Sequence, residues 1–245
     1  MIVNKSEKVR LQKVIANRGL CSRRKAEERI RQGEVWVNGK IAYIGQKVDA
    51  CKDHIFVGKK PILPTAPKRQ VLVLNKPKGF ICSNNDPFHK ENIFGLLPYK
   101  YRRERLFCVG RLDKDSEGLV ILTNDGELAH HIMHPSHRVI KRYRVTLNKH
   151  FDIKLIPKLL TGVHSDGEWL KVDRVIPPTR SSNDVRTLEV VLSHGRKREL
   201  RRLFEAFQYR VKRLTRFQIG RIGMNRLPSG AVRSLSEHEI KQLWH

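Results

Sequence analysis

Hydrophobic positions in the first 57 residues predict two short helices followed by a small β unit. Leu11, Val14 and Ile15 are spaced like one face of a helix, and Gly19 can end that helix. Ser22 then stands where an N-cap is needed, and the residues after it repeat the helical spacing. Apolar and polar residues alternate next in EVWVNGK, whose Asn-Gly pair is a strong signal for a β-hairpin.

A proline-rich segment separates this module from the rest of the chain. Pro61, Pro64 and Pro67 fall every third residue in GKKPILPTAPKR, which suits a semi-extended linker better than a helix or an inner strand. We therefore expect a first domain at residues 1–57, a linker at 58–69 and a larger second domain at 70–245.

The second domain has strand-like segments that cluster without regular alternation with helices. Strands are predicted at Val71–Lys76, Gly118–Thr123, Tyr143–Leu147, Thr187–Leu192 and Val211–Ile219, and helices at Gly126–Met133, Lys197–Phe207 and Ser236–Trp244. This order indicates the α+β class: a small αα-β domain, then a mixed, mostly antiparallel sheet flanked by helices.

The charge balance points to an anionic partner. Lys and Arg total 50 against 24 Asp and Glu, a formal net charge of +26. Phosphates are the natural partner, because neutralising them releases counterions. A membrane surface is the rival explanation, but no segment offers a long amphipathic helix with a bulky apolar face, and no run of about 18 apolar residues exists.

The four cysteines are widely spaced, and none forms a Cys-x-x-Cys pair. Neither a disulfide framework nor a zinc ribbon is expected from such spacing. The first ten residues are polar and mixed in charge, so no secretory signal is expected. A reducing, cytoplasmic setting is therefore expected.

Basic residues gather in the first module and at the start of its second predicted helix. Positive side chains beside free backbone N–H groups make a phosphate-docking surface, although a solvated charged face would give the same composition. The candidate RNA-binding residues are Arg10, Lys13, Ser22, Arg23, Arg24, Lys25 and Lys40. The stretch VRLQKVIANRGLCSRRKAEERIRQGEVWVNGK resembles the RNA-binding domain of the ribosomal protein S-four type over residues 9–57. That resemblance implies binding to structured RNA, mostly through shape and phosphates.

A second pattern, GRLD, ends at Asp113 and is followed by KDSEGLVILTNDGEL. By itself it indicates a turn with an acid, then a buried strand and a capped helix. An Asp before a strand is more often a turn or cap residue than a catalyst.

Together with three further motifs, this pattern resembles the RsuA/RluB group of ribosomal pseudouridine synthases. The other motifs are KPKG at 76–79, KRYRV at 141–145 and GRKRELR at 195–201, so the resemblance spans nearly the whole chain. It implies Asp113 as nucleophile, Arg201 as its charge partner and Tyr143 as a residue against the base that assists proton removal. It also implies substrate-binding roles for Arg111 and Leu200, with Lys76 in the supporting layer.

The implied reaction explains why these residue types are needed. Pseudouridine is an isomer of uridine, so no redox change occurs and no cofactor or metal is required. A carboxylate can serve as the nucleophile if a nearby guanidinium keeps it ionised. The target uridine must be flipped out of folded RNA, which costs a few kcal/mol.

Plain structural explanations compete for the other candidates. Tyr143 lies in an alternating strand, and Leu200 falls in an apolar helical stripe, so both could be core residues. Glu199 departs from the pattern of the RsuA/RluB group, which often has Gln at this position. The Glu199 carboxylate could add a negative charge near Asp113 or pair with a neighbouring Arg. The spacing of His130, His131, His134 and His137 could hold zinc, but Pro135 should end the helix, and RNA contact or capping is preferred.

The sequence thus predicts an enzyme that isomerises a uridine of ribosomal RNA. The alternative is a non-catalytic RNA-binding or ribosome-assembly factor on the same fold. NNDP at Asn84–Pro87 and MHPS at Met133–Ser136 look closest to the RluB type, which points to large-subunit rRNA. The substrate could be naked RNA or an assembly intermediate, and a monomer is expected from the resemblance.

Overall fold

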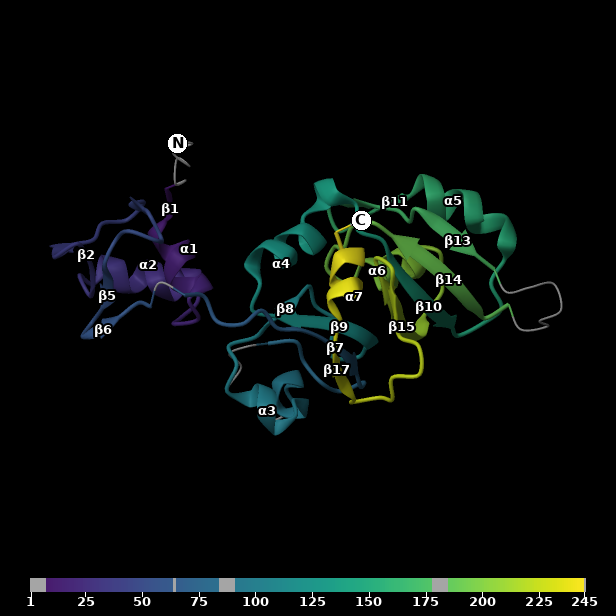
Figure 1. Ribbon diagram of the computed structural model, residues 1–245. Helices are drawn as coiled ribbons and strands as arrows, with labels where there is room; N and C mark the ends of the chain where they lie inside the picture. Colours follow the sequence, from purple (N-terminus) through teal and green to yellow (C-terminus); the bar gives the residue numbers. More distant parts are fainter. Residues whose placement is uncertain (1–7, 64, 84–90, 178–184, 245) are drawn as a thin grey trace, which may run out of the picture. The chain divides into compact units, whose positions relative to one another are not determined.

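The computed structural model describes residues 8–63, 65–83, 91–177 and 185–244. The chain divides into two compact units, Met1–Arg69 and Gln70–His245 (Figure 1). Each unit has its own hydrophobic core, so each is described by itself.

The first unit packs two helices on short strands. Its elements are β1 (Val9–Arg10), α1 (Leu11–Asn17), α2 (Arg23–Arg31), β2 (Val35–Val37), β3 (Lys40–Ile41), β4 (Lys47–Val48), β5 (Ile55–Val57) and β6 (Lys60–Pro61). Leu11, Ile15 and Ala26 are fully buried and join the two helices to Val35 and Val48 in one core. The two predicted helices and the Asn38-Gly39 turn are present.

The expected linker starts later than predicted. Lys60 and Pro61 form β6, which pairs with β5 at the edge of the four-stranded sheet β3-β2-β5-β6. Ile62 extends this pairing by donating its N–H to the carbonyl of Ile55 at 2.8 Å. Proline is compatible with an edge strand because its missing N–H can face away from the neighbouring strand. The proline-rich segment therefore contains an edge strand of the first unit as well as the linker between the two units.

The second unit is built on a mixed, mostly antiparallel sheet, which confirms the predicted α+β class. Its main path runs β13-β14-β10-β15-β9-β7-β17, with β16 paired to β15 and β8 to β9. The strands are β7 (Val71–Lys76), β8 (Phe107–Val109), β9 (Glu117–Thr123), β10 (Lys141–Leu147), β11 (Val163–Ser165), β12 (Glu168–Leu170), β13 (Arg174–Ile176), β14 (Thr187–Leu192), β15 (Val211–Ile219), β16 (Ile222–Gly223) and β17 (Val232–Ser234). β11 and β12 form a separate hairpin.

Helices cover both faces of this sheet. They are α3 (Tyr99–Arg102), α4 (Gly126–Met133), α5 (Ile156–Thr161), α6 (Glu199–Ala206) and α7 (Glu237–Gln242), with 3₁₀ turns η1 (Ile93–Leu96), η2 (Pro135–His137) and η3 (Ile153–Leu155). Leu72 and Leu74 face the core that contains α6, whereas Val71 and Val73 face the core that contains α4 and α7 (Figure 1). Strand β7 is therefore buried on both sides, which explains its unbroken apolar run.

Two predicted helices are shorter in the structure. The helix predicted from Lys197 begins at Glu199, because Arg198 adopts a left-handed conformation (φ 50°) at its N-cap. The last helix begins at Glu237, after a capping box formed by Ser236 and Glu239. In the described parts of the chain, no helix is long and apolar enough to cross a membrane.

The two halves of the sheet meet where β9 and β15 pair in parallel, at Thr215↔Glu117 and Arg216↔Gly118. Gly118 has a φ of +110°, which side-chain-bearing residues rarely adopt. A Cβ on Gly118 would lie 2.2 Å from the backbone oxygen of Arg216. Only glycine therefore allows this approach of the two backbones.

We predict that Gly118→Ala lowers the free energy of unfolding by at least about 2 kcal/mol, because it adds both a backbone clash and conformational strain. Urea denaturation followed by circular dichroism would measure the loss. Gly95→Ala is the matched control, since a Cβ there meets no atom within 4 Å and the φ of Gly95 is ordinary. Equal stability of the two variants would contradict this account of the junction.

Candidate active site

A cavity of about 520 Å³ in the second unit brings together four of the predicted site residues. Arg111 and Asp113 enter it from the loop between β8 and β9, Tyr143 from β10 and Leu200 from α6. These positions span almost 90 residues of sequence, so it is the folding of the sheet and α6 that brings the side chains together. Arg201 and Lys76 do not line this cavity.

Asp113 lies at the turn that precedes β9. Its carbonyl accepts the N–H of Ser116 at 3.1 Å, which closes the turn. Its carboxylate is 38% exposed and lies 3.9 Å from a guanidinium nitrogen of Arg198. Asp113 is therefore both a turn residue and an accessible carboxylate beside a cation. The turn role and the catalytic role expected for Asp113 are therefore compatible.

Arg201 contacts the loop through Asp115, and Asp113 lies close enough to act on its guanidinium electrostatically, so its role as charge partner of Asp113 stays a prediction. Its Nε lies 3.2 Å from a carboxylate oxygen of Asp115, and its Nη2 donates to the Asp115 carbonyl at 3.0 Å. Its Nη1 donates to the carbonyl of Val211 at 2.9 Å. Burial raises the pKa of Asp115, but the Arg201 and Arg198 guanidiniums outweigh it and hold that pKa below its usual range. Arg201 thus ties the Asp113 loop to β15.

Lys76 supports the loop that carries Asp113 through a hydrogen bond to its backbone. It is fully buried, and its Nζ donates to the carbonyl of Ser116 at 2.6 Å and to that of Pro77 at 3.0 Å. Burial lowers the pKa of Lys76, against the opposing attraction of nearby acidic groups. A direct substrate contact from Lys76 does not fit this placement, whereas the expected supporting role does.

Tyr143 and Leu200 are core residues and cavity residues at once. Tyr143 pairs with Val190 of β14 and Arg216 of β15 in the centre of the sheet, and Leu200 occupies the first turn of α6. Both are buried in the core that contains α6, and both line the cavity. The two interpretations of each residue are therefore compatible.

Arg216 is a cavity residue that the motifs did not indicate. It is buried, and its Nε donates to the carbonyl of Leu119 at 2.8 Å. Its Nη2 has no hydrogen-bond partner among the described residues. A buried, unsatisfied guanidinium nitrogen is costly unless a ligand completes it. Arg216 is thus a candidate donor to a bound nucleotide.

Glu199 pairs with His194 and with backbone. Its Oε2 accepts the N–H of Arg196 at 2.9 Å, and a carboxylate oxygen lies 3.0 Å from Nδ1 of His194. The carboxylate is nearly fully buried. This acid therefore fixes the turn before α6 and forms none of the Arg pairs considered from the sequence.

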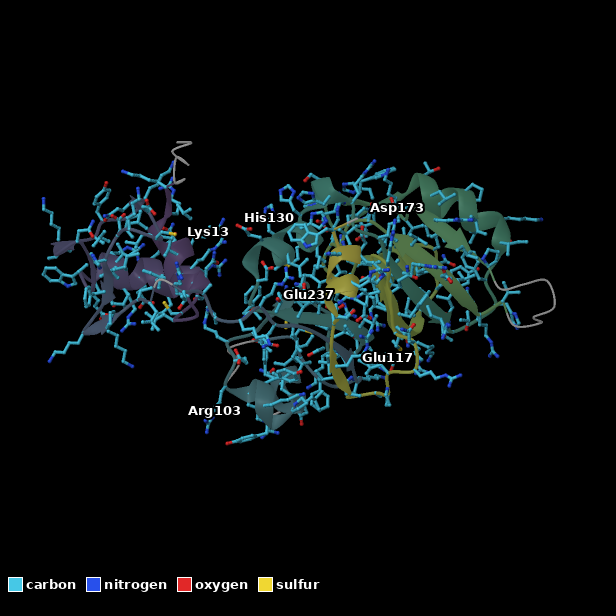
Figure 2. All side chains as sticks on the ribbon, in the orientation of Figure 1. Lys13, Arg103, Glu117, His130, Asp173 and Glu237 are labelled. Carbon is cyan, nitrogen blue, oxygen red and sulfur yellow. The ribbon has the colours of Figure 1, made fainter. Side chains whose placement is uncertain are left out.

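The basic residues of the first unit divide into engaged and exposed groups. Ser22 caps α2 by accepting the N–H of Lys25 at 3.2 Å, and Arg10 donates to the carbonyl of Gly45 at 2.7 Å. Lys25 also pairs with Glu28 at 3.0 Å. Arg23, Arg24 and Lys40 are exposed, and Lys13 is partly buried. Nitrogen-tipped side chains project around this unit (Figure 2).

The histidines after Asp125 stack on one another. The rings of His130 and His134 lie 4.8 Å apart, and those of His131 and His137 lie 4.4 Å apart. Over the described residues, no group of three or more His, Cys, Asp or Glu side chains could hold a metal ion. His134 accepts the N–H of Ser136 at 3.3 Å, which is the capping expected near Pro135.

Two cysteines also lie at this site without any sequence signal. Cys82 accepts the N–H of Leu112, next to Asp113, at 3.5 Å, and Cys108 lines the cavity. A hydrogen bond from Cys108, helped by the Leu112 N–H and by Arg216 and Lys76, outweighs burial and lowers the pKa of Cys82 to about 6. The same hydrogen bond and burial raise the pKa of Cys108.

We predict that a thiolate appears in the folded protein as pH rises through about 6 and is absent from Cys82→Ser. Because the folded-state pKa lies below that of a free thiol, this group stabilises the fold at higher pH, and that contribution is lost as pH falls through about 6. The ultraviolet absorbance of the thiolate reports the titration. Cys51→Ser, which changes an exposed thiol, should leave the transition in place. The same transition in Cys82→Ser would refute the assignment.

Comparison with known families agrees with both units. Residues 70–206 match the family of RNA pseudouridylate synthases, and residues 9–53 match the S4 domain. An uncharacterized RNA pseudouridine synthase of Aquifex aeolicus is 37% identical over 238 residues, which cover 96% of this chain and 94% of that protein. The ribosomal large subunit pseudouridine synthase B of Bacillus subtilis is 34% identical over 236 residues, covering 96% of this chain and 95% of that protein.

A solved structure is similar over the same extent. A crystal structure of a pseudouridylate synthase has a TM-score of 0.69 and 32% sequence identity to this protein, covering 96% of this chain and 99% of that one. The resemblances drawn from GRLD, KPKG and the basic first module are thereby confirmed. The chain belongs to the RNA pseudouridylate synthase family and carries an S4 domain before its catalytic domain.

Proposed function

We propose that this enzyme converts a specific uridine of large-subunit ribosomal RNA into pseudouridine, with Asp113 as the nucleophile. The observation that carries the catalytic part is the cavity, where the exposed Asp113 carboxylate meets Tyr143, Leu200 and Arg216. Similar proteins from Bacillus subtilis and Pseudomonas aeruginosa, named ribosomal large subunit pseudouridine synthase B, support the choice of RNA. Two segments of the sequence also favour large-subunit rRNA. Met133–Ser136 borders the cavity through Met133, and Asn84–Pro87 lies outside the described residues.

The reaction needs the base to leave the RNA stack and enter the cavity. The Asp113 carboxylate, 3.9 Å from a guanidinium nitrogen of Arg198, forms a transient covalent bond with the nucleoside. The bond between ribose C1′ and N1 of uracil breaks, the retained base turns, and C1′ bonds to C5. The proton on C5 leaves and N1 gains one, so the atoms balance without a cofactor. Tyr143 is placed to accept or relay that proton, and Leu200 packs against the base.

Arg201 acts on this chemistry through the loop that carries Asp113. Its contacts with Asp115 and with the Val211 carbonyl hold the loop against β15. Arg198 provides the nearer positive charge, and Arg216 provides a free donor to the flipped nucleotide. We propose these roles as a division of labour among three arginines.

The first unit supplies affinity for the RNA. Its exposed Arg23, Arg24 and Lys40, together with Arg10, Lys13, Ser22 and Lys25, form the proposed phosphate-contacting set. Action as a monomer, expected from the family resemblance, is part of the proposal. A cytoplasmic site of action, on naked RNA or an assembly intermediate, completes the proposal.

We predict that Asp113→Asn abolishes pseudouridine formation and leaves RNA affinity within about twofold, because the change removes one charge and almost no volume. Single-turnover assays on rRNA fragments and fluorescence anisotropy would measure the two quantities. Asp115→Asn is an informative comparison, since it weakens the loop and keeps the Asp113 carboxylate. An Asp113→Asn enzyme that still forms product would reject the nucleophile, and no product from wild type on any rRNA would favour a binding-only factor.

Tyr143→Phe should keep the fold and slow the chemical step by roughly 10²–10⁴-fold, because it removes a proton-transfer group and retains the buried ring. Single-turnover rates and thermal unfolding would be compared. Tyr209→Phe is the control, because that hydroxyl accepts the N–H of Asp152 at 3.1 Å and Tyr209 does not line the cavity. Equal rates for the two variants would assign Tyr143 to packing alone.

A further inference from the structure

A second cavity, of about 640 Å³, lies on the second unit and takes no part in the proposed chemistry. Its wall includes His131 and His137 from the α4–η2 region and Trp244 after α7. Three arginines, Arg138, Arg174 and Arg221, line it as well. Asp173, labelled in Figure 2, is the acid in its wall.

The two cavities lie back to back at the same strand ends. Along β10, Lys141 and Tyr143 line the catalytic cavity, whereas Arg142 lines the second one. Along β14, Leu192 faces the first and Val191 the second. Successive side chains of a strand point to opposite faces of a sheet, so one sheet thickness separates the cavities. The two cavities therefore lie on opposite faces of the sheet, at the same strand ends.

The second cavity has a positive charge that the described residues do not neutralise. Arg138, Arg174 and Arg221 are exposed and form no ion pair within the described residues. The fourth arginine, Arg142, is compensated by Glu189, to which its Nε donates at 2.6 Å. The carboxylate of Asp173, the acid in the cavity wall, already accepts a hydrogen bond from the N–H of Ser193. The cavity is therefore suited to an anion.

Aromatic rings in the same cavity favour a ligand that has a flat ring as well as a negative charge. Trp244 is 39% exposed, and its ring lies 4.7 Å from that of His131. The ring of His131 in turn lies 4.4 Å from that of His137. An accessible indole beside cations is the combination that stacks a nucleobase and holds its phosphate. Each stacked base typically contributes about 1–3 kcal/mol to such binding.

We propose that this cavity binds a nucleotide from a single-stranded part of the RNA whose target uridine lies at Asp113. The base stacks on Trp244 and His131, and Arg138, Arg174 and Arg221 contact the phosphates. The site gives the catalytic domain its own hold on the RNA, separate from the S4 domain. It rests on the proposed function for the choice of RNA as ligand, and on the residues of this cavity for the binding.

Trp244 fluorescence tests the proposal at the site itself. The chain has three tryptophans, so Trp36→Phe and Trp169→Phe leave Trp244 as the reporter. We expect a short single-stranded oligoribonucleotide to quench this signal at saturation. Arg174→Ser with Arg221→Ser should weaken that quenching roughly tenfold in Kd, as expected for lost phosphate contacts. Arg103→Ser with Arg226→Ser, two exposed arginines outside both cavities, should leave it unchanged.

The remaining arms separate the other outcomes. Quenching by inorganic tripolyphosphate equal to that by RNA would reduce the site to an anion site, and equal quenching by an acidic peptide would indicate a protein partner. No quenching by RNA would overturn the proposal directly. The titration is repeated with Asp113→Asn, which should quench like wild type. A wild-type protein that shows quenching but forms no product would count against the proposed function, and a wild-type protein that forms product without quenching would count against this inference.

Discussion

The close parallel contact between β9 and β15 at Gly118 is the constraint on which the rest of the site depends. It joins two antiparallel halves of the sheet, and it does so one residue after the loop that carries Asp113. The loop is then held from three sides. Lys76 binds the Ser116 carbonyl, Arg201 binds Asp115, and Glu117 accepts from Thr215 at 2.8 Å and pairs with Arg213. Asp113 is thereby left as the acid of this loop that faces the cavity.

This arrangement explains how a protein with a net charge of +26 can keep a usable carboxylate. Asp115 pairs with Arg201 at 3.2 Å and with Arg198 at 3.3 Å, and Asp113 has the looser contact with the same Arg198 at 3.9 Å. A carboxylate with a tight bidentate partner would be a poor nucleophile, whereas one near a cation stays ionised and accessible. The surplus positive charge lies on the surface of both units, where RNA phosphates can reach it.

Local patterns in the sequence were sufficient for most of the fold. The long strands and α4 have clear periodicity, and the strands β7, β14 and β15 have the predicted bounds. Short elements such as β6 and β8 are too brief for any period to appear, and they form because longer strands offer them an edge. For the site, motif resemblance indicated Asp113, Tyr143 and Leu200, which share one cavity. The partner of Arg201 and the position of Arg216 depend on contacts between residues 86 and 97 positions apart, and Cys82 meets Leu112 from 30 positions away. No local pattern encodes contacts over such separations.

The central claim is that Asp113 makes pseudouridine at one position of large-subunit rRNA, and mapping of pseudouridine in both rRNAs tests it most directly. A base-specific chemical adduct read by primer extension would compare cells with and without the protein. We predict that one large-subunit position loses its signal, and that wild type restores it while Asp113→Asn does not. Unchanged maps in cells without the protein, or restoration by Asp113→Asn, would contradict the account.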